Sequence, residues 1–223
     1  MKTALLLIAT SENYWSYIDP LLESAKRFFV PHVPVLFTDD PAPHKAYQIY
    51  HKAEGFPNAT LKRYHTFLKH KDRLLSFDYI FYIDVDALFV SMVGEEVFGD
   101  GITATLHHGY AKKRFNCLKD CPETNINSTA YLPNPSNYYC GGFNGGKSAA
   151  YLEMAEAIKR NVDIDESKGV LAKWHDESYL NKYLADNPPA KVLSSDYCYP
   201  EPELHVPCIP KIVCLDKSLR GGR

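Results

Sequence analysis

Short apolar runs alternate with segments of helical periodicity through the first half of the chain, and this alternation constrains the fold most. Residues 5–9 and 33–38 are strand-like, and between them apolar residues recur at helical spacing over residues 18–29. Strands of a parallel sheet are near-continuous apolar runs, because helices cover both faces of the sheet. The sequence therefore predicts an α/β fold, with a Rossmann-like mixed, mainly parallel sheet flanked by helices in a single domain.

The remaining expected elements continue this alternation, which is lost only in the middle of the chain. In chain order they are a helix from Asn58 to Leu75, strands at residues 79–83 and 102–107, a helix whose apolar face is Tyr151, Leu152, Ala155 and Ile158, a helix at residues 177–184 capped by Asp176, and strands at residues 191–193 and 212–215. Residues 108–135 have no periodicity. We therefore expect a long loop there, of a kind that is usually functional or mobile.

Length and composition indicate one ordinary globular domain. The 223 residues, 45% hydrophobic and 23% charged, can form one sizeable core. A net charge of -2 gives no sign of a surface for nucleic acid. The apolar run near the N-terminus is too short for a secretory signal, and no stretch approaches the roughly 20 apolar residues that a transmembrane anchor needs.

Six cysteines stand at positions 117, 121, 140, 198, 208 and 214. They include no Cys-x-x-Cys pair, so the sequence gives little support to a zinc site. We expect free thiols in a reducing compartment, although Cys117 and Cys121 are near enough in sequence to pair in an oxidising one.

Two carboxylates, Asp84 and Asp86, follow the aromatic strand predicted at residues 79–83. Side chains alternate along an extended strand, so both carboxylates are expected to point the same way. In open α/β sheets the ligand crevice lies outside the carboxyl ends of the strands, and oxygen ligands suit Mg²⁺ or Mn²⁺. The pair predicts a metal site for a diphosphate, and the alternative is an acidic turn after a strand.

The run Trp174-His175-Asp176-Glu177-Ser178 is the second dense polar cluster. Capping is the expected role of Asp176, since carboxylates favour helix N-termini. Glu177 can instead project into a crevice beside the Trp174 ring, which suits stacking on a sugar. The alternative for Glu177 is an ordinary acidic first turn.

The glycine-rich stretch at residues 140–146 matches neither the dinucleotide-binding fingerprint nor a Walker phosphate loop. Glycine lets the backbone approach a ligand closely, so one interpretation is the floor of a pocket. The other interpretation is a tight turn before a helix.

These motifs occur in one order that is more specific than any of them alone. The set is Asp84-Val85-Asp86, Leu106-His107 with Gly109, Ala130-Tyr131-Leu132-Pro133, Tyr138-Tyr139 followed by Gly-Gly-Phe-x-Gly-Gly, and Trp174-His175-Asp176-Glu177-Ser178 followed by Asn181-Lys182-Tyr183. Together they resemble glycosyltransferase family 6, which includes the blood-group A and B transferases, the α-1,3-galactosyltransferases and shorter bacterial relatives. The resemblance covers residues 7–217.

The resemblance implies a GT-A fold and a metal-dependent retaining hexosyltransferase. The expected reaction moves N-acetylgalactosamine, or less readily galactose, from a UDP-sugar to the 3-hydroxyl of a galactose-terminated acceptor, fucosylated acceptors included. Asp84 and Asp86 correspond to the metal-binding Asp-x-Asp, which holds Mn²⁺, with Mg²⁺ as the second choice. Glu177 corresponds to the catalytic glutamate, as nucleophile or as stabiliser of an oxocarbenium-like state, and covalent and same-face mechanisms both stay open.

The resemblance also assigns binding residues and divides the chain. The donor would contact Ala9, Thr10, Ser11, Tyr14, Thr60, Arg63, Asp84, Val85, Asp86, Cys140, Gly141, Gly142, Asp176, Lys217 and Arg223. The acceptor would contact His107, Trp174, Glu177 and Glu201. Residues 1–90 would form the nucleotide-binding half, 91–215 the acceptor and catalytic half, and 216–223 a basic tail that closes over the phosphates. Glycine at position 142 leaves room for an acetamido group and so favours N-acetylgalactosamine.

Departures from the family pattern concern the acceptor and the compartment. His108 replaces the usual proline, residues 108–127 lack the Thr-Tyr-Glu-Arg-Arg pattern, and Glu201 stands where the mammalian enzymes have an acceptor-binding aspartate. Because no membrane anchor or stem is evident, we expect a soluble microbial or viral protein in the cytoplasm, with the periplasm less favoured.

Two other functions fit parts of the pattern. A catalytically inactive glycan-binding module would use the aromatics and glycines without transferring sugar. A phosphatase of the haloacid-dehalogenase type also carries Asp-x-Asp at a strand end, but Leu88 stands where it needs threonine or valine.

Overall fold

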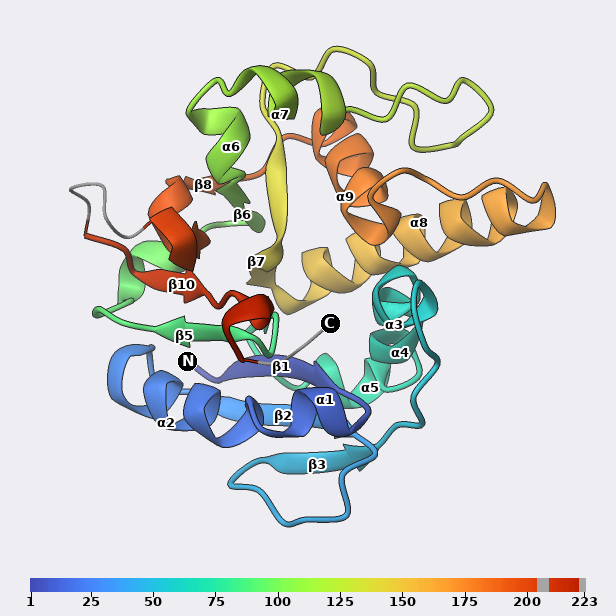
Figure 1. Cartoon of the computed structure of the whole chain (residues 1–223). Coiled ribbons are helices and arrows are strands. Elements are labelled where there is room, and N and C mark those ends of the chain that lie inside the picture. Colours follow the sequence, from blue (N-terminus) through green and yellow to red (C-terminus); the bar gives the residue numbers. More distant parts are fainter. Residues whose placement is uncertain (204–208, 221–223) are drawn as a thin grey trace.

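The computed structural model describes residues 1–203 and 209–220, and its centre is a seven-stranded sheet (Figure 1). The order across the sheet is β3-β2-β1-β4-β7-β6-β8. The strands are β1 (Thr3–Ala9), β2 (Val33–Thr38), β3 (Tyr47–Tyr50), β4 (Tyr79–Ile83), β6 (Ile102–Leu106), β7 (Tyr139–Lys147) and β8 (Lys191–Leu193). Only β7 runs antiparallel to its neighbours β4 and β6, and the other adjacent pairs are parallel. The predicted mixed, mainly parallel sheet is confirmed.

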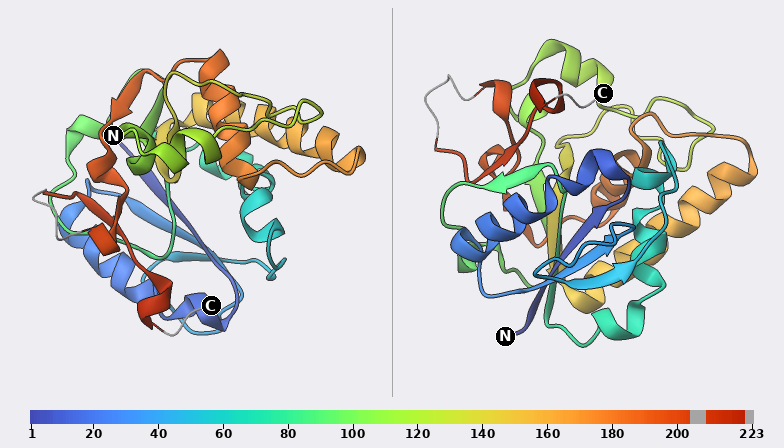
Figure 2. Two further views of the ribbon diagram at one scale, coloured as in Figure 1. Left: turned by 45° about the horizontal axis from the view of Figure 1, so that its top comes forward. Right: turned by 60° about the horizontal axis from the view of Figure 1, so that its bottom comes forward.

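Alternating side chains divide the core between the two faces of this sheet. Leu5 and Leu7 of β1 pack with α2 (Ile18–Phe28) on one face. Leu6 packs on the other face, with α4 (Arg63–Leu68), α8 (Ser148–Ser167) and α9 (His175–Asp186). Figure 2 shows α2 in blue and α8 in gold on opposite sides of the molecule. The helices therefore cover both faces, as a near-continuous apolar β1 requires.

A second, three-stranded sheet brings the C-terminal segment to the acidic pair. Its order is β5 (Ala87–Phe89), β10 (Ile212–Cys214) and β9 (Tyr199–Pro200), with β10 antiparallel to β5 and parallel to β9. Phe89 and Ile212 pack in the same core as α2. Because β5 follows Asp86 directly, its partner β10 delivers the next turn, η4 (Lys217–Arg220), to the end of β4. The other short 3₁₀ turns are η1 (Glu95–Val97), η2 (Ser195–Tyr197) and η3 (Glu201–Glu203).

The single helix predicted from Asn58 to Leu75 is wrong, because the segment forms three short helices. They are α3 (Asn58–Leu61), α4 and α5 (Lys71–Leu74). The backbone leaves the helical region at Lys62 (φ -102°, ψ 15°) and at His70 (φ -119°, ψ 22°). Asn58 is the first residue of α3 and not its cap. These breaks keep Tyr64 and Phe67 fully buried, whereas Leu75 is 45% exposed.

The expected long loop at residues 108–135 also contains helices, α6 (His108–Ala111) and α7 (Phe115–Asp120). Another short helix, α1 (Glu12–Trp15), follows β1. Helices of one or two turns are too short to repeat an apolar pattern, so periodicity cannot reveal them.

The glycine-rich stretch is a buried central strand and not a tight turn. β7 pairs with β4 and β6 on its two sides, and Gly145 faces Phe81 across the first pair. A Cβ added to Gly145 would lie 2.3 Å from the Phe81 ring, and Gly146 has φ 144°, which side chains rarely tolerate. These two glycines serve strand packing, which leaves Gly141 and Gly142 for a pocket.

The expectation of free thiols is wrong for Cys140 and Cys198, whereas Cys117 and Cys121 form the pair that the sequence analysis left open. Cys117 pairs with Cys121 and Cys140 pairs with Cys198, while Cys214 keeps a free thiol. The two bonds form because the fold brings the sulfur atoms together, across one helix in the first case and between β7 and the η2–β9 segment in the second. None of the helices over residues 1–203 and 209–220 has the length and apolarity that crossing a membrane demands.

Candidate active site

The acidic pair lies in the turn between β4 and β5, beyond the last strand residue Ile83. Strand alternation is therefore the wrong reason for placing the two carboxylates together, since Val85 and Asp86 belong to the turn. Both aspartates nevertheless line the same pocket. The Tyr82 hydroxyl donates a hydrogen bond to Asp84 Oδ1 over 2.5 Å, and the Asp84 amide donates to the Gly142 carbonyl over 2.9 Å.

Two pockets meet at this turn. The β1-side pocket, of about 230 Å³, is lined by Ile8, Thr10, Ser11, Tyr14, Ala53, Gly55, Phe56, Ala59, Thr60, Arg63, Tyr82, Asp84, Val85, Asp86 and Lys217. The β7-side pocket, of about 680 Å³, is lined by Asp84, His107, His108, Gly109, Arg114, Phe115, Asn116, Cys117, Cys140, Gly142, Glu177, Cys198, Pro200 and Cys214. Asp84 borders both, so the pockets form one crevice along the carboxyl edge of β1 and β4.

Most of the residues expected at the donor border the β1-side pocket. Cys140 and Gly142 border the β7-side pocket instead, and Gly141 and Asp176 border neither pocket. Ala9 also lies outside both, because it is 1% exposed and its carbonyl accepts a hydrogen bond from Thr38. Ser11 has φ 75° and ψ 149°, a conformation that is strained for a residue with a side chain. Its amide donates to Asp39 Oδ1 over 2.8 Å, which holds the bend where the chain leaves β1.

Arg63, the first residue of α4, borders the β1-side pocket and contacts residues from several chain segments. Its guanidinium pairs with Asp176 over 2.9 Å and with Asp84 over 3.4 Å, and donates to the Gly141 carbonyl over 3.2 Å. It also lies 4.3 Å from the centre of the Tyr82 ring. Arg63 is only 5% exposed, and a buried charge with several partners is costly to displace. The arginine therefore fixes three chain segments around the crevice.

Glu177 faces Gly141 from the first turn of α9. The Gly141 amide donates to Glu177 Oε2 over 2.7 Å. Asn181 fixes the same helix to β7, since its side chain accepts from the Tyr139 amide and donates to the Tyr139 carbonyl. Burial, and then the charges of Asp176 and Asp84, raise the pKa of Glu177 to about 7, although the Gly141 amide works in the opposite direction. The side chain projects into a crevice, as predicted for Glu177.

Asp176 is not the N-cap of α9. Trp174 occupies that position, and the side chain of Asp176 is buried at the second residue of the helix. Burial raises the pKa of Asp176 to about 6 despite the opposing effect of Arg63. Asp176 therefore acts as the buried partner of Arg63.

Lys217 brings a positive charge to the acidic turn. Its ammonium lies 2.9 Å from Asp86 Oδ2 and 5.0 Å from the centre of the Tyr14 ring. Burial lowers the pKa of Lys217, but the hydrogen bonds and charges of Asp86 and Tyr14 together outweigh burial and raise that pKa. Burial and the Asp84 charge raise the pKa of Asp86, while Lys217 lowers it. Arg223, the other basic tail residue expected at the donor, lies outside the described residues.

The expected acceptor residues separate into two groups. His107 and Glu177 border the β7-side pocket, and burial followed by the neighbouring His108 lowers the pKa of His107 to about 4. Trp174 is 46% exposed and its indole donates to the Asp120 carbonyl, outside the pocket lining. Glu201 accepts a hydrogen bond from the Asp216 amide, and its neighbour Pro200 borders the pocket instead.

Several residues of the crevice were not predicted from the sequence. Tyr82 could have been found, because it stands two residues before Asp84 at the end of the aromatic strand. Cys198 and Cys214 could not, since their Sγ atoms, 3.2 Å apart, meet only through the pairing of β9 with β10. Arg114, Phe115 and Asn116 lie in the segment that was expected to be a loop.

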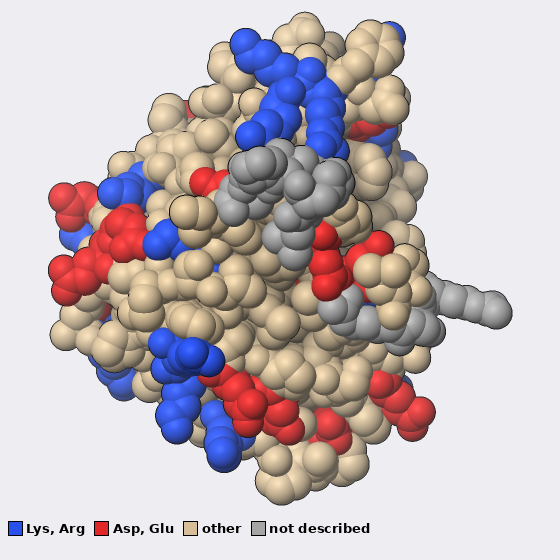
Figure 3. Space-filling view, turned by 60° about the vertical axis from the view of Figure 1, so that its left-hand side comes forward, with Lys and Arg blue, Asp and Glu red and all other residues tan. Residues whose placement is uncertain are grey.

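The molecular surface carries charge in small patches. Figure 3 shows basic side chains gathered at the upper end of one face and on its lower flank, with acidic side chains between them. Exposed basic residues also follow α6, at Lys112, Lys113 and Arg114. Arg114 borders the β7-side pocket, so positive charge reaches the rim of the crevice.

A Rossmann-like, mainly parallel sheet with paired carboxylates and a crevice at its carboxyl edge defines the GT-A class of fold. The model of glycosyltransferase family 6 matches residues 2–217. The chain therefore belongs to glycosyltransferase family 6, and the haloacid-dehalogenase alternative is wrong.

Individual relatives are similar over shorter or longer stretches. A human globoside α-1,3-N-acetylgalactosaminyltransferase 1 is 30% identical over 93% of this chain and 64% of its own length. A rat histo-blood group ABO system transferase 1 is 37% identical over 60% of this chain and 38% of its own length. An O-antigen biosynthesis glycosyltransferase of Escherichia coli is 36% identical over 66% of this chain and 62% of its own length. This chain thus spans less than two thirds of the length of these relatives.

Proposed function

We propose that the protein is a retaining α-1,3-glycosyltransferase that moves N-acetylgalactosamine from UDP to the 3-hydroxyl of a galactose-terminated acceptor. The observation that carries the proposal is the position of Arg63. It contacts Asp84, Asp176 and the Gly141 carbonyl, so the acidic turn, the glycine floor and the segment that holds Glu177 border one crevice. Membership of family 6 and the transferase names of the relatives support the same reaction class.

The β1-side pocket suits the UDP part of the donor. The Tyr14 ring offers a face for the uracil, since aromatic side chains stack on flat ligands. Thr10 and Ser11 supply polar groups beside it. Lys217 lies beside the Tyr14 ring and pairs with Asp86, where its ammonium can neutralise phosphate charge that develops as UDP departs.

The acidic turn fits a divalent cation. Two carboxylates are hard oxygen ligands, and the raised pKa of Asp86 reflects burial and repulsion by Asp84, which a cation would relieve. Asp84 and Asp86 would hold Mn²⁺, or Mg²⁺ as the second choice. A bound ion supplies the charge that lets a diphosphate leave as a stabilised anion.

Glu177 is proposed as the catalytic carboxylate. The Gly141 amide and the Asn181 contacts hold it at the β7-side pocket, on the far side of Gly141 from Arg63. An ionised Glu177 can attack the anomeric carbon or stabilise positive charge on the sugar ring. Both retaining mechanisms need this carboxylate without its proton, so activity depends on the fraction of Glu177 that is ionised.

Gly142 and the Cys140–Cys198 disulfide border the space proposed for the sugar. A Cβ on Gly142 would lie 2.9 Å from Asp84 Oδ2 and 3.2 Å from Cys198 Sγ. Glycine at this position therefore lets Asp84 and Cys198 approach the strand closely. The preference for N-acetylgalactosamine over galactose rests on the resemblance to family members in which a small residue at this position leaves room for the acetamido group. His107 would contact the acceptor from the opposite rim of the same pocket.

The direct test measures UDP release from UDP-N-acetylgalactosamine and from UDP-galactose, with 2′-fucosyllactose as acceptor and Mn²⁺ present or chelated. We expect metal-dependent release that is faster with the first donor. Glu177→Gln should lower turnover by at least about 100-fold and leave UDP binding nearly unchanged, and Asp84→Asn should weaken both. The exposed Asp72→Asn serves as the matched control.

Three results would contradict the proposal. Absence of metal-dependent UDP release with either donor, over a panel of galactose-terminated acceptors, would overturn the transferase function. Glycan binding without any release would favour the inactive glycan-binding module. Loss of UDP affinity in Glu177→Gln would mean that Glu177 belongs to the nucleotide site.

A further inference from the structure

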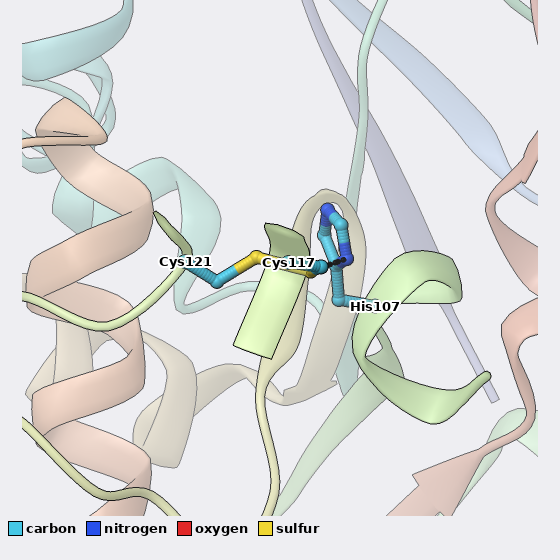
Figure 4. Close-up of side chains that lie close together, drawn as sticks. All are labelled: His107, Cys117 and Cys121. Carbon is cyan, nitrogen blue, oxygen red and sulfur yellow. Dashed lines mark hydrogen bonds between the residues drawn. A yellow bond between two sulfur atoms is a disulfide. The ribbon is translucent and has the colours of Figure 1, made fainter. Parts of the chain in front are cut away.

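His107, Cys117 and Cys121 form a compact cluster at the rim of the β7-side pocket. One nitrogen of His107 and the two sulfur atoms all lie within 4.8 Å of one another. Figure 4 shows the imidazole and the Cys117–Cys121 disulfide turned toward each other. Nitrogen and thiolate sulfur are the ligands that Zn²⁺ favours in proteins.

Local structure brings the two cysteines onto one side of α7. They are four residues apart, with Cys117 inside the helix and Cys121 at its C-cap, and their Cα atoms lie 5.2 Å apart. Side chains at this spacing are neighbours on a helix surface. A Cys-x-x-x-Cys spacing on a helix can therefore present two sulfur ligands together. The absence of a Cys-x-x-Cys pair from the sequence does not exclude a metal site of this kind.

The third ligand comes from the end of β6. His107 Nδ1 lies 3.5 Å from Cys117 Sγ. Tetrahedral Zn²⁺ with Zn–S near 2.3 Å and Zn–N near 2.0 Å requires an S···N distance of about 3.5 Å and an S···S distance of about 3.8 Å. The histidine and Cys117 already have this separation, and the two sulfurs reach theirs by side-chain rotation once they are no longer bonded.

Close packing holds the cluster in place. A Cβ on Gly109 would lie 3.1 Å from both Cβ and Sγ of Cys117, so glycine at this position lets α6 sit directly against α7. His107 and Cys117 also border the pocket, where a water or a ligand can take a fourth position.

We propose that His107, Cys117 and Cys121 bind a Zn²⁺ ion when the Cys117–Cys121 disulfide is reduced. A thiol reductant supplies two electrons and two protons and becomes a disulfide. A phosphine supplies two electrons and becomes a phosphine oxide, while water supplies the oxygen and the two protons. Either reductant converts the Cys117–Cys121 disulfide to two thiols. Binding of Zn²⁺ then displaces the two thiol protons to solvent. The disulfide and the metal exclude each other, so the cluster has two alternative states.

The test titrates the whole protein with Co²⁺ and then Zn²⁺, with and without prior reduction by a phosphine in the absence of oxygen. In the reduced protein, one equivalent of Co²⁺ should give thiolate-to-cobalt charge-transfer absorption, and Zn²⁺ should abolish it. Carboxylate ligands give no such absorption, so binding at Asp84 and Asp86 is distinguished. The readout does not use sugar transfer and is independent of the proposed function.

Variants assign the ligands. Cys117→Ser and Cys121→Ser should each weaken Zn²⁺ binding at least tenfold, and His107→Ala should weaken it while keeping thiolate absorption. Cys140→Ser and Cys214→Ser are the matched controls and should keep binding. In the unchanged protein, Zn²⁺ should protect Cys117 and Cys121 from alkylation, which needs no variant that must fold.

Several outcomes would overturn the proposal. They are the absence of charge-transfer absorption in the reduced protein, equal Zn²⁺ affinity in the oxidised protein, and absorption that Cys140→Ser or Cys214→Ser abolishes. Alkylation of Cys117 and Cys121 at the same rate with and without Zn²⁺ would also overturn it.

Discussion

At the scale of single residues, the surroundings of Glu177 favour the protonated carboxyl. Burial, Asp176 and Asp84 together raise its pKa to about 7, and the Gly141 amide only partly opposes them. The folded state therefore binds more protons than the unfolded chain between about pH 4.5 and pH 7. The contribution of this group to stability is favourable below that window and is lost as the pH rises through it.

Replacing this carboxyl should stabilise the protein at alkaline pH. Glutamine keeps an oxygen for the Gly141 amide and has no charge to bury, so Glu177→Gln should raise the free energy of unfolding by about 2 kcal/mol at pH 8 and by much less at pH 5. Urea unfolding at the two pH values measures this. The exposed Glu153→Gln on α8 should show no such difference, and an equal effect of Glu177→Gln at both pH values would contradict the interpretation.

Single residues also show where prediction from sequence ends. The roles of Asp84 and Asp86 were expected from their place after an aromatic strand, although the reason for their orientation was wrong. Arg63 was expected only as a donor contact, because its three partners belong to distant segments of the chain. Packing in the folded chain, and no local pattern, determines that its guanidinium is buried among them.

At the scale of elements, the second sheet links the C-terminal segment to the acidic turn. β10 pairs with β5, which begins at the residue after Asp86, and η4 then carries Lys217 back to Asp86. An ammonium at this carboxylate occupies the position that suits a divalent cation. If the proposed cation binds at Asp86, it would compete with the lysine for one oxygen in the absence of UDP.

Removing this ammonium should separate metal affinity from nucleotide affinity. Lys217→Ala should bind Mn²⁺ several-fold more tightly than the unchanged protein when UDP is absent, and should bind UDP more weakly, because phosphate charge is then less well neutralised. Calorimetric titrations of Mn²⁺ and of UDP measure both constants. Lys182→Ala, which removes the exposed pair with Asp186, is the control. Weaker Mn²⁺ binding in Lys217→Ala would show that no competition exists.

Elements differ in how far the sequence reveals them. β1, β2, β4 and α2 are long or strongly patterned, and they were predicted at nearly the correct residues, whereas for α8 only the apolar face was predicted and not its bounds. β7 was missed because glycine has low strand propensity, and only its place between β4 and β6 makes small residues necessary. The three helices over residues 58–74 were merged into one, since their breaks depend on packing against the sheet.

At the scale of the whole molecule, the Cys140–Cys198 disulfide connects parts of the fold that the sheet alone leaves separate. It joins β7 to the segment before β9 across a sequence separation of 58 residues. The Cys117–Cys121 disulfide spans a separation of only 4 residues. In the chain-entropy account, the longer loop restricts the unfolded chain more.

The two disulfides should therefore differ in their effect on stability. The double variant Cys140→Ser/Cys198→Ser should lose about 4 kcal/mol of unfolding free energy under oxidising conditions, against about 2 kcal/mol for Cys117→Ser/Cys121→Ser. Urea unfolding with and without a reductant measures the loss. In each double variant, the missing disulfide should no longer contribute to the change in unfolding free energy that the reductant causes. Equal losses of unfolding free energy in the two double variants would contradict the loop-length argument.

Asp84 borders both pockets, so a ligand in either pocket can contact the same side chain. A molecule in the β1-side pocket that draws Asp84 toward itself changes what the β7-side pocket offers to a second molecule. Linkage then demands symmetry, because the factor by which the first ligand alters the affinity of the second must equal the factor by which the second alters the first. Cooperativity between nucleotide and sugar would thus follow from the sharing of one carboxylate, without any movement of the sheet.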